Sequence, residues 1–306
     1  MKKTVLFGGS GMLGAAIKHT FQNSILCPNS NQVDLMDLES ITKYLLQEKP
    51  DSVINVAALV AGILANRATP YDFYFKNQIM LLNVLQSCLN LKIPYLLTCS
   101  STCAYPDICN NYPMKESDMF NGNPSNDNLG YGLAKRNIIC AVQLANKQFG
   151  AKYGVIVPSN LYGPRDRHYG NASAHYVTNL IFKLINRQGK NSITIGGSGK
   201  PLRQFTYVYD VAKAISLMVN NYDDDVLNCA SPENLSIIEL AKQTIEANSI
   251  NVTIDLDTSF PDGQFRKDVS SERLIKKYNF EFTKFYKGIK ETYEWYNTFG
   301  EKHHIQ

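Results

Sequence analysis

A phenol and an ammonium group lie four residues apart in this sequence, as Tyr131 and Lys135. Side chains at that spacing project from the same face of a helix. A free tyrosine has a pKa of about 10, and a neighbouring cation lowers that pKa toward neutral pH. Such a phenol can donate a proton to a carbonyl oxygen while the carbonyl carbon receives a hydride. The same spacing also arises by chance on exposed helices, so other elements must place the pair in a site.

Two serines that follow a short apolar run supply a second part of this chemistry. Residues 95–99 are predicted to form a buried strand, and Ser100 and Ser101 follow it directly. Ligands of doubly wound folds bind outside the carboxyl ends of the strands. We therefore expect Ser101 to hydrogen-bond a substrate carbonyl, with Ser100 as the alternate.

A glycine-rich turn stands between the first apolar run and an amphipathic stretch. It comprises Gly8, Gly9, Ser10, Gly11, Met12, Leu13 and Gly14. We expect Gly8 to permit a tight turn, Gly11 to let the backbone approach a pyrophosphate, and Gly14 to let the helix pack closely. The N-terminus of the following helix offers free N–H groups and a positive dipole end to phosphates. In this strand-turn-helix setting the turn predicts a dinucleotide-binding site.

The glycine spacing resembles that of the short-chain dehydrogenase/reductase superfamily. The resemblance implies that Asp37 meets the adenine of the cofactor, whereas a helix N-cap is the alternative, and the sequence leaves both open. No Asp or Glu lies at 26–29, after the second predicted strand, to bind a ribose 2′-hydroxyl. We therefore expect the cofactor to be NADPH. The candidate contacts to its 2′-phosphate are Ser10, Asn29, Ser30 and Asn31.

The elements that must position these residues follow from the apolar pattern. Short runs predict strands at 4–7, 24–27, 52–56, 95–99 and 153–157, with amphipathic stretches between them. This alternation predicts an α/β fold with a Rossmann-like doubly wound parallel sheet. Beyond Pro158 the pattern predicts helices at 175–186, 210–220 and 236–247, and strands at 192–195 and 204–208.

The mixed second half predicts a smaller C-terminal α/β substrate lobe. We place an NADP-binding Rossmann domain at 1–160 with part of 205–232, and a discontinuous nucleotide-sugar-binding lobe at 161–306. The segment 107–129 is rich in Asn, Pro, Asp and Ser and has no apolar period. It is therefore expected to be a long surface loop, which in a compact domain is often functional.

Composition narrows the class of protein. The chain has 306 residues, of which 44% are hydrophobic, so it can bury a substantial core. Its net charge of +4 is dispersed, which argues against a nucleic-acid-binding surface. The apolar run near the N-terminus ends at Gly8, too early for a secretion signal or a membrane span. Seven cysteines without a Cys-x-x-Cys pair indicate reduced thiols, no metal site and a cytoplasmic protein.

Further residues narrow the resemblance to one family. Cys103 stands two residues after Ser101, and His175 follows the segment 158–166. Together with 57–63, 203–205 and 261–267, these residues closely resemble the GDP-L-fucose synthases over nearly the whole chain. Members of that family are NADPH-dependent epimerase-reductases that act on GDP-4-keto-6-deoxy-D-mannose. This chain departs from the family at Gly196, where tryptophan is common, and the departure leaves the substrate contacts open.

The resemblance implies roles in two reaction stages. Cys103 and His175 are implied to exchange protons at carbons 3 and 5 of the sugar, which the ketone at carbon 4 acidifies. Tyr131, Lys135 and Ser101 are implied to carry out the reduction of that ketone. A buried apolar thiol is the alternative for Cys103, and a structural histidine is the alternative for His175.

The resemblance also implies binding residues and partners. The further cofactor contacts are Ala57, Lys135, Pro158, Asn160, Leu161 and His175. The substrate contacts are Lys183, Arg203 and Lys267 for the diphosphate, with Asp262 for the guanine or ribose. The apolar pattern at 71–91 and the helix after Tyr131 resemble paired dimer helices, so a homodimer is expected.

Two rival functions remain at this point. One is another nucleotide-sugar 4-ketoreductase or 4-epimerase on the same fold, in which Cys103 and His175 have no catalytic role. The other is a regulatory protein that binds NADP without turnover. The intact pair of Tyr131 and Lys135 argues against the regulatory protein.

Overall fold

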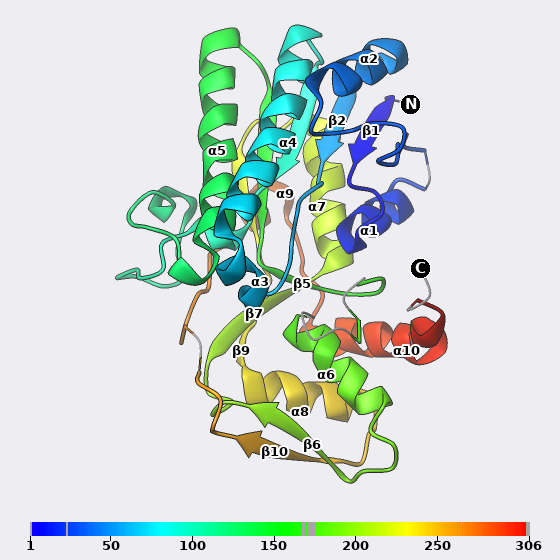
Figure 1. Ribbon diagram of the computed structural model, residues 1–306, viewed down its shortest axis with the longest axis vertical. Coiled ribbons are helices and arrows are strands. Elements are labelled where there is room, and N and C mark those ends of the chain that lie inside the picture. The colour runs from blue at the N-terminus through cyan, green and yellow to red at the C-terminus, as the bar shows by residue number, and fades with distance from the viewer. Residues whose placement is uncertain (1, 23, 167–168, 171–174, 263, 304–306) are drawn as a thin grey trace.

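The largest sheet is parallel and is built mainly from the N-terminal half of the chain (Figure 1). The structure is a computed structural model that describes residues 2–22, 24–166, 169–170, 175–262 and 264–303. All neighbouring strands of this sheet pair in parallel. In spatial order its five strands are β1 (Thr4–Phe7), β2 (Ser52–Asn55), β3 (Tyr95–Cys99), β4 (Tyr153–Pro158) and β8 (Val226–Cys229).

Helices cover both faces of this sheet (Figure 1). One face packs against α1 (Met12–Thr20) and α7 (Val208–Asn221), and the other against α2 (Leu38–Glu48), α4 (Pro70–Asn90) and α5 (Leu129–Phe149). Within β1, Leu6 joins the first cluster, and Val5 and Phe7 join the second. Successive side chains of a strand point to opposite faces, so a sheet buried on both faces needs continuous apolar runs. The predicted Rossmann-like doubly wound fold is confirmed.

A smaller α/β part lies at the other end of the molecule (Figure 1). One of its sheets contains β5 (Asn160–Tyr162), β7 (Leu202–Tyr207) and β9 (Asn234–Ser236). The other contains β6 (Ser192–Gly196) and β10 (Thr253–Asp257). Two further apolar clusters join these strands to α6 (Tyr176–Ile185), α8 (Ile237–Ala247) and α10 (Phe285–His303). Among the described residues, no helix is both long and apolar enough to cross a membrane.

Two further helices are short. They are α3 (Ile63–Ala68), which precedes α4, and α9 (Glu272–Tyr278). Leu274 of α9 is fully buried in the cluster formed by α1, α7 and the main sheet. The chain therefore returns to the main sheet after it has built most of the smaller part.

Two predicted strands were placed wrongly. The strand expected at 24–27 is reduced to a single parallel bridge between Leu26 and Val5. Pro28 follows closely and has no N–H group to continue the hydrogen-bond ladder. The strand expected at 204–208 begins earlier, at Leu202, and Val208 instead opens α7.

The segment 107–129 is not simply a surface loop. It contains two turns of 3₁₀ helix, η2 (Glu116–Asp118) and η3 (Asn126–Asn128). Met114 and Met119 are buried in the core of the main sheet. The backbone of Met114 also accepts a hydrogen bond of 2.7 Å from the N–H of Ser270. Isolated methionines show no periodicity in a sequence, so their burial was missed.

Candidate active site

The glycine-rich turn joins β1 to α1 at the carboxyl edge of the main sheet. Gly8 has a φ of +89°, and a Cβ atom there would lie 2.5 Å from the backbone nitrogen of Ala57. A Cβ atom at Gly14 would lie 2.2 Å from the carbonyl oxygen of Gly8. At Gly11 the nearest atom would be that same oxygen, at an ordinary contact distance of 3.7 Å. The protein's own packing therefore requires glycine at 8 and 14, whereas the space beside Gly11 is open and fits a pyrophosphate.

The start of α1 is suited to an anion. Its N-cap is Gly11, which supplies no side chain to bond the first N–H groups of the helix. The first turn holds no acidic residue, and the basic residues Lys18 and His19 lie in the last turn. The unbonded N–H groups and the positive end of the helix dipole thus face the glycine turn. These residues fit the phosphates of a dinucleotide.

The polar residues near the expected adenine end already have internal contacts. Asp37 is the N-cap of α2, and its Oδ1 atom accepts the N–H of Glu39 at 2.9 Å. The N-cap alternative is therefore the observed one, and the adenine contact stays a prediction. Asn29 accepts the N–H groups of Asn31 and Gln32 through its Oδ1 atom, so its side chain stabilises its own turn. The other candidate contacts to a 2′-phosphate, Ser10, Ser30 and Asn31, are exposed.

Ser101, Cys103 and Tyr131 come together beyond the end of β3. The Oγ atom of Ser101 accepts the N–H of Cys103 at 3.2 Å, and Ser101 is the N-cap of η1 (Thr102–Ala104). The same hydroxyl and the thiol of Cys103 both influence the pKa of the Tyr131 phenol, so both groups lie near it. A hydroxyl, a thiol and a phenol therefore share one small site.

Lys135 is held in place behind Tyr131. Its side chain is buried, and its Nζ atom donates to the carbonyl oxygen of Cys99 at 2.8 Å. The ammonium group lies 5.7 Å from the centroid of the Tyr131 ring. The hydroxyl of Ser100 donates to the carbonyl oxygen of Lys135 at 2.7 Å. Ser100 therefore anchors α5 to the sheet, and Ser101 is the hydroxyl that faces the phenol.

Burial controls the protonation of the phenol and the ammonium group. Desolvation raises the pKa of Tyr131 well above its ordinary value; the nearby Cys103 and Cys99 thiols raise it further, and the hydrogen bond with Ser101 opposes the shift. Desolvation also lowers the pKa of Lys135, and Cys99 and Cys103 oppose that shift. The expectation of a lowered phenol pKa is wrong for this structure, because the loss of hydration on burial is the largest influence and raises the pKa. Tyr131 consequently remains protonated at neutral pH, as a proton donor must be.

The turn that carries Cys103 is clamped against α5. A Cβ atom at Gly132 would lie 2.5 Å from the carbonyl oxygen of Cys103, so the helix backbone contacts the turn directly. The Nδ2 atom of Asn128 donates to the Sγ atom of Cys103 at 3.1 Å. Arg136 donates from its Nε atom to the carbonyl oxygen of Ala104 at 2.8 Å. Asn128 and Arg136 were not predicted from the sequence, although both lie close to Tyr131 and Lys135 in the chain.

His175 stands on a different element from the other catalytic candidates. It is the N-cap of α6, and its side chain is 36% exposed. Its Nδ1 atom lies 3.6 Å from the carboxylate of Asp166, which is itself buried and accepts the hydroxyl of Thr178 at 2.7 Å. Asp166 can therefore orient the imidazole ring. Residues 171–174, just before His175, lie outside the described residues, and the pairing of His175 with Cys103 stays a prediction.

The last three cofactor candidates follow the carboxyl end of β4. Pro158 is the final residue of that strand and pairs with Cys229 of β8. Asn160 opens β5, and its side-chain amide donates to the carbonyl oxygen of Gln204 at 3.3 Å. Leu161 packs partly against the core formed with α1 and α7. These residues share the carboxyl edge of the sheet with Ser101, and their cofactor contacts stay predictions.

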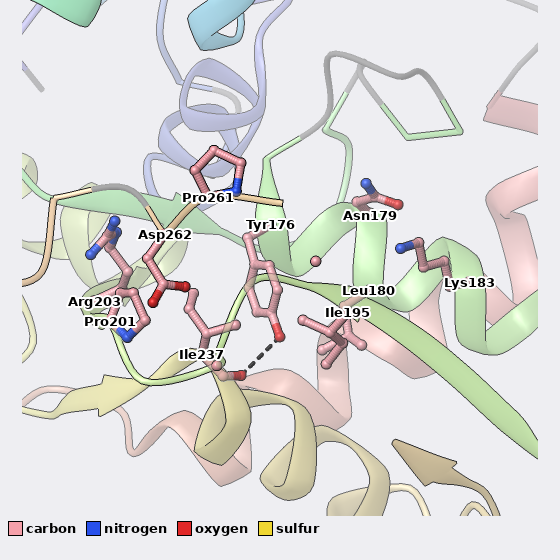
Figure 2. Close-up of a pocket in the computed structure, with 12 residues that line it drawn as sticks. Tyr176, Asn179, Leu180, Lys183, Ile195, Pro201, Arg203, Ile237, Pro261 and Asp262 are labelled. Carbon is pink, nitrogen blue, oxygen red and sulfur yellow. Dashed lines mark hydrogen bonds between the residues drawn. The ribbon is translucent and has the colours of Figure 1, made fainter. Parts of the chain in front are cut away.

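A pocket of about 260 Å³ lies in the smaller part, between α6, β6, β7, the start of α8 and the segment after β10 (Figure 2). Three of the four predicted substrate residues line it, namely Lys183, Arg203 and Asp262. The fourth, Lys267, is half-buried and does not line this pocket. Residue 263, within the motif at 261–267, lies outside the described residues. The other lining residues are Tyr176, Asn179, Leu180, Ile195, Gly196, Gly199, Pro201, Ile237 and Pro261.

The polar side chains of the pocket are fixed by hydrogen bonds. The Nη1 atom of Arg203 donates to the carbonyl oxygen of Gln264 at 2.6 Å; burial lowers the pKa of Arg203 and Asp262 opposes that shift. Hydrogen bonds from the side chain and backbone of Ser198 lower the pKa of Asp262, so this carboxylate remains ionised. The Nζ atom of Lys183 donates to the carbonyl oxygen of Thr194 at 2.9 Å.

The shape of the pocket follows from its aromatic residues. The Tyr176 ring stands at the centre of the pocket, where its hydroxyl donates to the carbonyl oxygen of Ile237 at 2.8 Å (Figure 2). Arg203 and Asp262 lie on one side of this ring, and Lys183 lies on the other (Figure 2). A Cβ atom at Gly196 would lie 3.3 Å from the side chain of Phe260, a residue that is 60% exposed. Phe260 thus fills the space that a larger residue at 196 would need.

The residues that could bind a metal ion or form a disulfide form neither kind of site in the part of the chain that the structure describes. Within it, no group of three or more His, Cys, Asp or Glu side chains is arranged to hold a metal ion. All seven cysteines are free thiols.

Comparisons with known proteins agree with this arrangement. The model of the NAD dependent epimerase/dehydratase family matches residues 4–230. The GDP-L-fucose synthase of Dictyostelium discoideum is 34% identical, over 96% of this chain and 95% of the relative. The GDP-L-colitose synthase of Yersinia pseudotuberculosis is 31% identical, over 89% and 90%. A crystal structure of a GDP-L-fucose synthetase from Naegleria fowleri bound to NADP has a TM-score of 0.88 and 28% identity, over 99% of this chain and 95% of that one.

Proposed function

Because the chain belongs to the NAD dependent epimerase/dehydratase family and, within it, to the GDP-L-fucose synthases, we propose that it converts GDP-4-keto-6-deoxy-D-mannose to GDP-L-fucose with NADPH. The conversion comprises epimerisation at carbons 3 and 5 and reduction of the ketone at carbon 4. The observation that carries the proposal is the thiol of Cys103 beside the phenol of Tyr131. A reductase that does not epimerise has no evident use for a thiol at that position.

The epimerisation stage is assigned to Cys103 and His175. The ketone at carbon 4 acidifies the hydrogens at carbons 3 and 5, because the electron pair of a broken C–H bond can move onto the ketone oxygen. One residue of the pair removes the proton from one face of the sugar, and the other returns a proton to the opposite face. The carboxylate of Asp166 lies 3.6 Å from the Nδ1 atom of His175, close enough to form an ion pair whenever the imidazole carries a proton.

The reduction stage is assigned to Tyr131, Lys135 and Ser101. NADPH, when bound, supplies hydride to carbon 4. Tyr131 donates its proton to the oxygen at that carbon, and its raised pKa keeps the proton available until then. The phenolate that forms is stabilised by the hydroxyl of Ser101 and by the ammonium group of Lys135, which the carbonyl oxygen of Cys99 holds in place.

The two ligands are assigned to the two parts of the molecule. NADPH binds at the glycine turn, which we assign to a Rossmann domain of residues 1–160 with part of 205–232. The nucleotide sugar binds in the lobe of residues 161–306, where the pocket supplies two cations for a diphosphate and one ionised carboxylate. Arg203 and Lys183 are placed against the diphosphate, and Asp262 against the guanine or ribose. The role of Lys267 stays a prediction.

Product analysis tests this proposal directly. The full chain is incubated with GDP-4-keto-6-deoxy-D-mannose and NADPH in deuterated water, and the product is examined by NMR. We expect GDP-L-fucose with deuterium at carbons 3 and 5. A reduced GDP-6-deoxyhexose with unaltered configuration and no deuterium at those carbons would identify a simple 4-ketoreductase instead.

The main alternative to the proposed function is activity on a different nucleotide sugar. A GDP-L-colitose synthase is among the relatives, and Gly196, which lines the pocket, stands where tryptophan is common in GDP-L-fucose synthases. The same assay with the keto sugar that leads to GDP-L-colitose measures this alternative. A kcat/KM higher for that sugar than for GDP-4-keto-6-deoxy-D-mannose would assign the chain to it.

We also infer that the protein is a cytoplasmic homodimer. Large apolar side chains are exposed along α4 and α5, namely Tyr71, Phe75, Leu82, Leu144 and Phe149. Pairing of two copies through these helices would bury those side chains, and the free thiols suit a reducing compartment. Light scattering after gel filtration should give twice the chain mass of 34.4 kDa. A mass equal to one chain would contradict the dimer.

A further inference from the structure

Asn128 occupies a helix N-cap position without acting as a cap. Asparagine is among the preferred N-cap residues because its side-chain oxygen accepts an N–H group of the first helical turn. Asn128 is the N-cap of α5, yet its side chain makes no such bond. Its Nδ2 atom instead donates to the Sγ atom of Cys103 at 3.1 Å. The side chain therefore does not make the usual local cap contact and instead contacts a thiol 25 residues away in the sequence.

The position of this amide is fixed by the backbone around it. A Cβ atom at Gly130 would lie 2.0 Å from the carbonyl oxygen of Pro70, and one at Gly132 would lie 2.5 Å from that of Cys103. The first turn of α5 is thus pressed against both α4 and the turn that carries the thiol. The Oδ1 atom of Asn128 is buried, and among the described residues it has no hydrogen-bond partner. The side-chain amide of Asn128 therefore acts only as a hydrogen-bond donor, and its acceptor is the sulfur of Cys103.

We propose that Asn128 is a positioning residue that holds the sulfur of Cys103 and stabilises its thiolate for proton exchange with the nucleotide sugar. The inference rests on the proposed function, because it gives Cys103 the role of a base. A thiolate accepts hydrogen bonds more strongly than a thiol does, so a fixed N–H donor favours the ionised form. An asparagine amide does not titrate, so the donor is present at every working pH.

The other charged and titratable groups near Cys103 define the setting of this contact. Tyr131 and Lys135 of α5 both lie within electrostatic range of the thiol. On the other side of Asn128, Asp127 is paired with Arg67 of α3, and the two charged groups lie 2.7 Å apart. The Asp127 charge is balanced by this pair, and the amide of Asn128 is the direct hydrogen-bond donor recorded on the sulfur.

The first experiment measures the thiolate without any substrate. The full chain is alkylated with iodoacetamide between pH 6 and pH 10, and the rate at Cys103 is read by peptide mass spectrometry, which separates it from the six other cysteines. Two variants remove the donor: Asn128→Ala leaves a gap, and Asn128→Asp keeps the shape but adds an anion. Asn126→Ala is the matched control, because Asn126 lies in the same 3₁₀ turn and is exposed.

We expect the midpoint of the alkylation profile at Cys103 to rise by about one pH unit in Asn128→Ala, and further in Asn128→Asp, because a charge-assisted hydrogen bond is lost. The midpoint for Asn126→Ala should match the wild type. A merely structural role would leave the midpoint unchanged even if it altered the melting temperature. Midpoints equal to the wild type in both Asn128 variants would overturn the proposal.

The second experiment links the contact to turnover. Deuterium uptake at carbons 3 and 5 should fall about tenfold in Asn128→Ala, while the Kd for NADPH stays within twofold of the wild type. If the wild type makes GDP-L-fucose and the variant exchanges protons at the wild-type rate, the positioning role is wrong. If the wild type makes no GDP-L-fucose although the alkylation midpoint shifts, the contact is as proposed and the assigned substrate is wrong.

Discussion

The glycine turn allows stability and cofactor binding to be separated by two matched substitutions, Gly11→Ala and Gly14→Ala. Gly11 has φ −78° and ψ 170°, a conformation that any residue adopts. A methyl group there meets only the carbonyl oxygen of Gly8, at 3.7 Å. At Gly14 the methyl group would lie 2.2 Å from that oxygen and 2.5 Å from the Cα atom of Gly9. Both of those are backbone atoms, so the second clash cannot be relieved by moving a side chain.

The expected effects on stability follow from these distances. For Gly11→Ala, reduced freedom of the unfolded chain stabilises by about 0.4–1 kcal/mol, and a poorer N-cap destabilises by about 0.5–1 kcal/mol. The two terms offset each other, so the melting temperature should stay within about 3 °C of the wild type. For Gly14→Ala, forced displacement of packed backbone should destabilise by about 1–3 kcal/mol and lower the melting temperature by about 2–6 °C.

Cofactor binding should be weakened in Gly11→Ala, the variant that is expected to keep its stability. The methyl group in Gly11→Ala occupies the space expected for the pyrophosphate. Loss of one charge-assisted hydrogen bond there, worth about 1.5–3 kcal/mol, should raise the Kd for NADPH about 10- to 150-fold. Fluorescence titration gives the Kd, and thermal unfolding without cofactor gives the stability. A stable Gly11→Ala variant that binds NADPH as tightly as the wild type would refute the assignment of this turn to the pyrophosphate.

Four further outcomes test the remaining assignments. Tyr131→Phe should lower the rate of NADPH oxidation by the keto sugar about 100-fold or more, with the Kd for NADPH unchanged, because only the phenolic proton is lost; substantial remaining turnover would point to another donor. Cys103→Ser should abolish most deuterium uptake at carbons 3 and 5 while some direct reduction persists, because a serine hydroxyl hardly ionises; normal formation of GDP-L-fucose would return this cysteine to a structural role. Arg203→Ala should raise the KM for the GDP-sugar about tenfold or more with little effect on NADPH, and the reverse pattern would move Arg203 to the cofactor site. Steady-state rates should favour NADPH over NADH, since no carboxylate follows the second predicted strand at 26–29 to repel a 2′-phosphate, and a clear preference for NADH would contradict that reading.

Local patterns in the sequence were sufficient to predict most strands of the main sheet. The strands predicted at 4–7 and 95–99 have the observed bounds, because strands buried on both faces must be continuously apolar. The glycine turn and the spacing of Tyr131 and Lys135 likewise depend on neighbouring residues alone. The prediction at 24–27 was wrong because strand pairing depends on a partner and on available N–H groups, and the apolar pattern records neither.

Contacts between segments distant in the chain were decided by the tertiary structure. Met114 and Met119 are buried although their segment looks like a loop, and Asn128 bonds Cys103 from across the site. The sequence predicted a lowered pKa for Tyr131 from one neighbouring cation, whereas the enclosure of the phenol raises it. The phenol loses its surrounding water because several segments of the chain pack around it together. Its desolvation therefore depends on the packed molecule and not on neighbouring residues in the sequence. The sequence by itself determined which chemical groups are present and which strand or helix carries them; their protonation and their partners follow from how those elements pack.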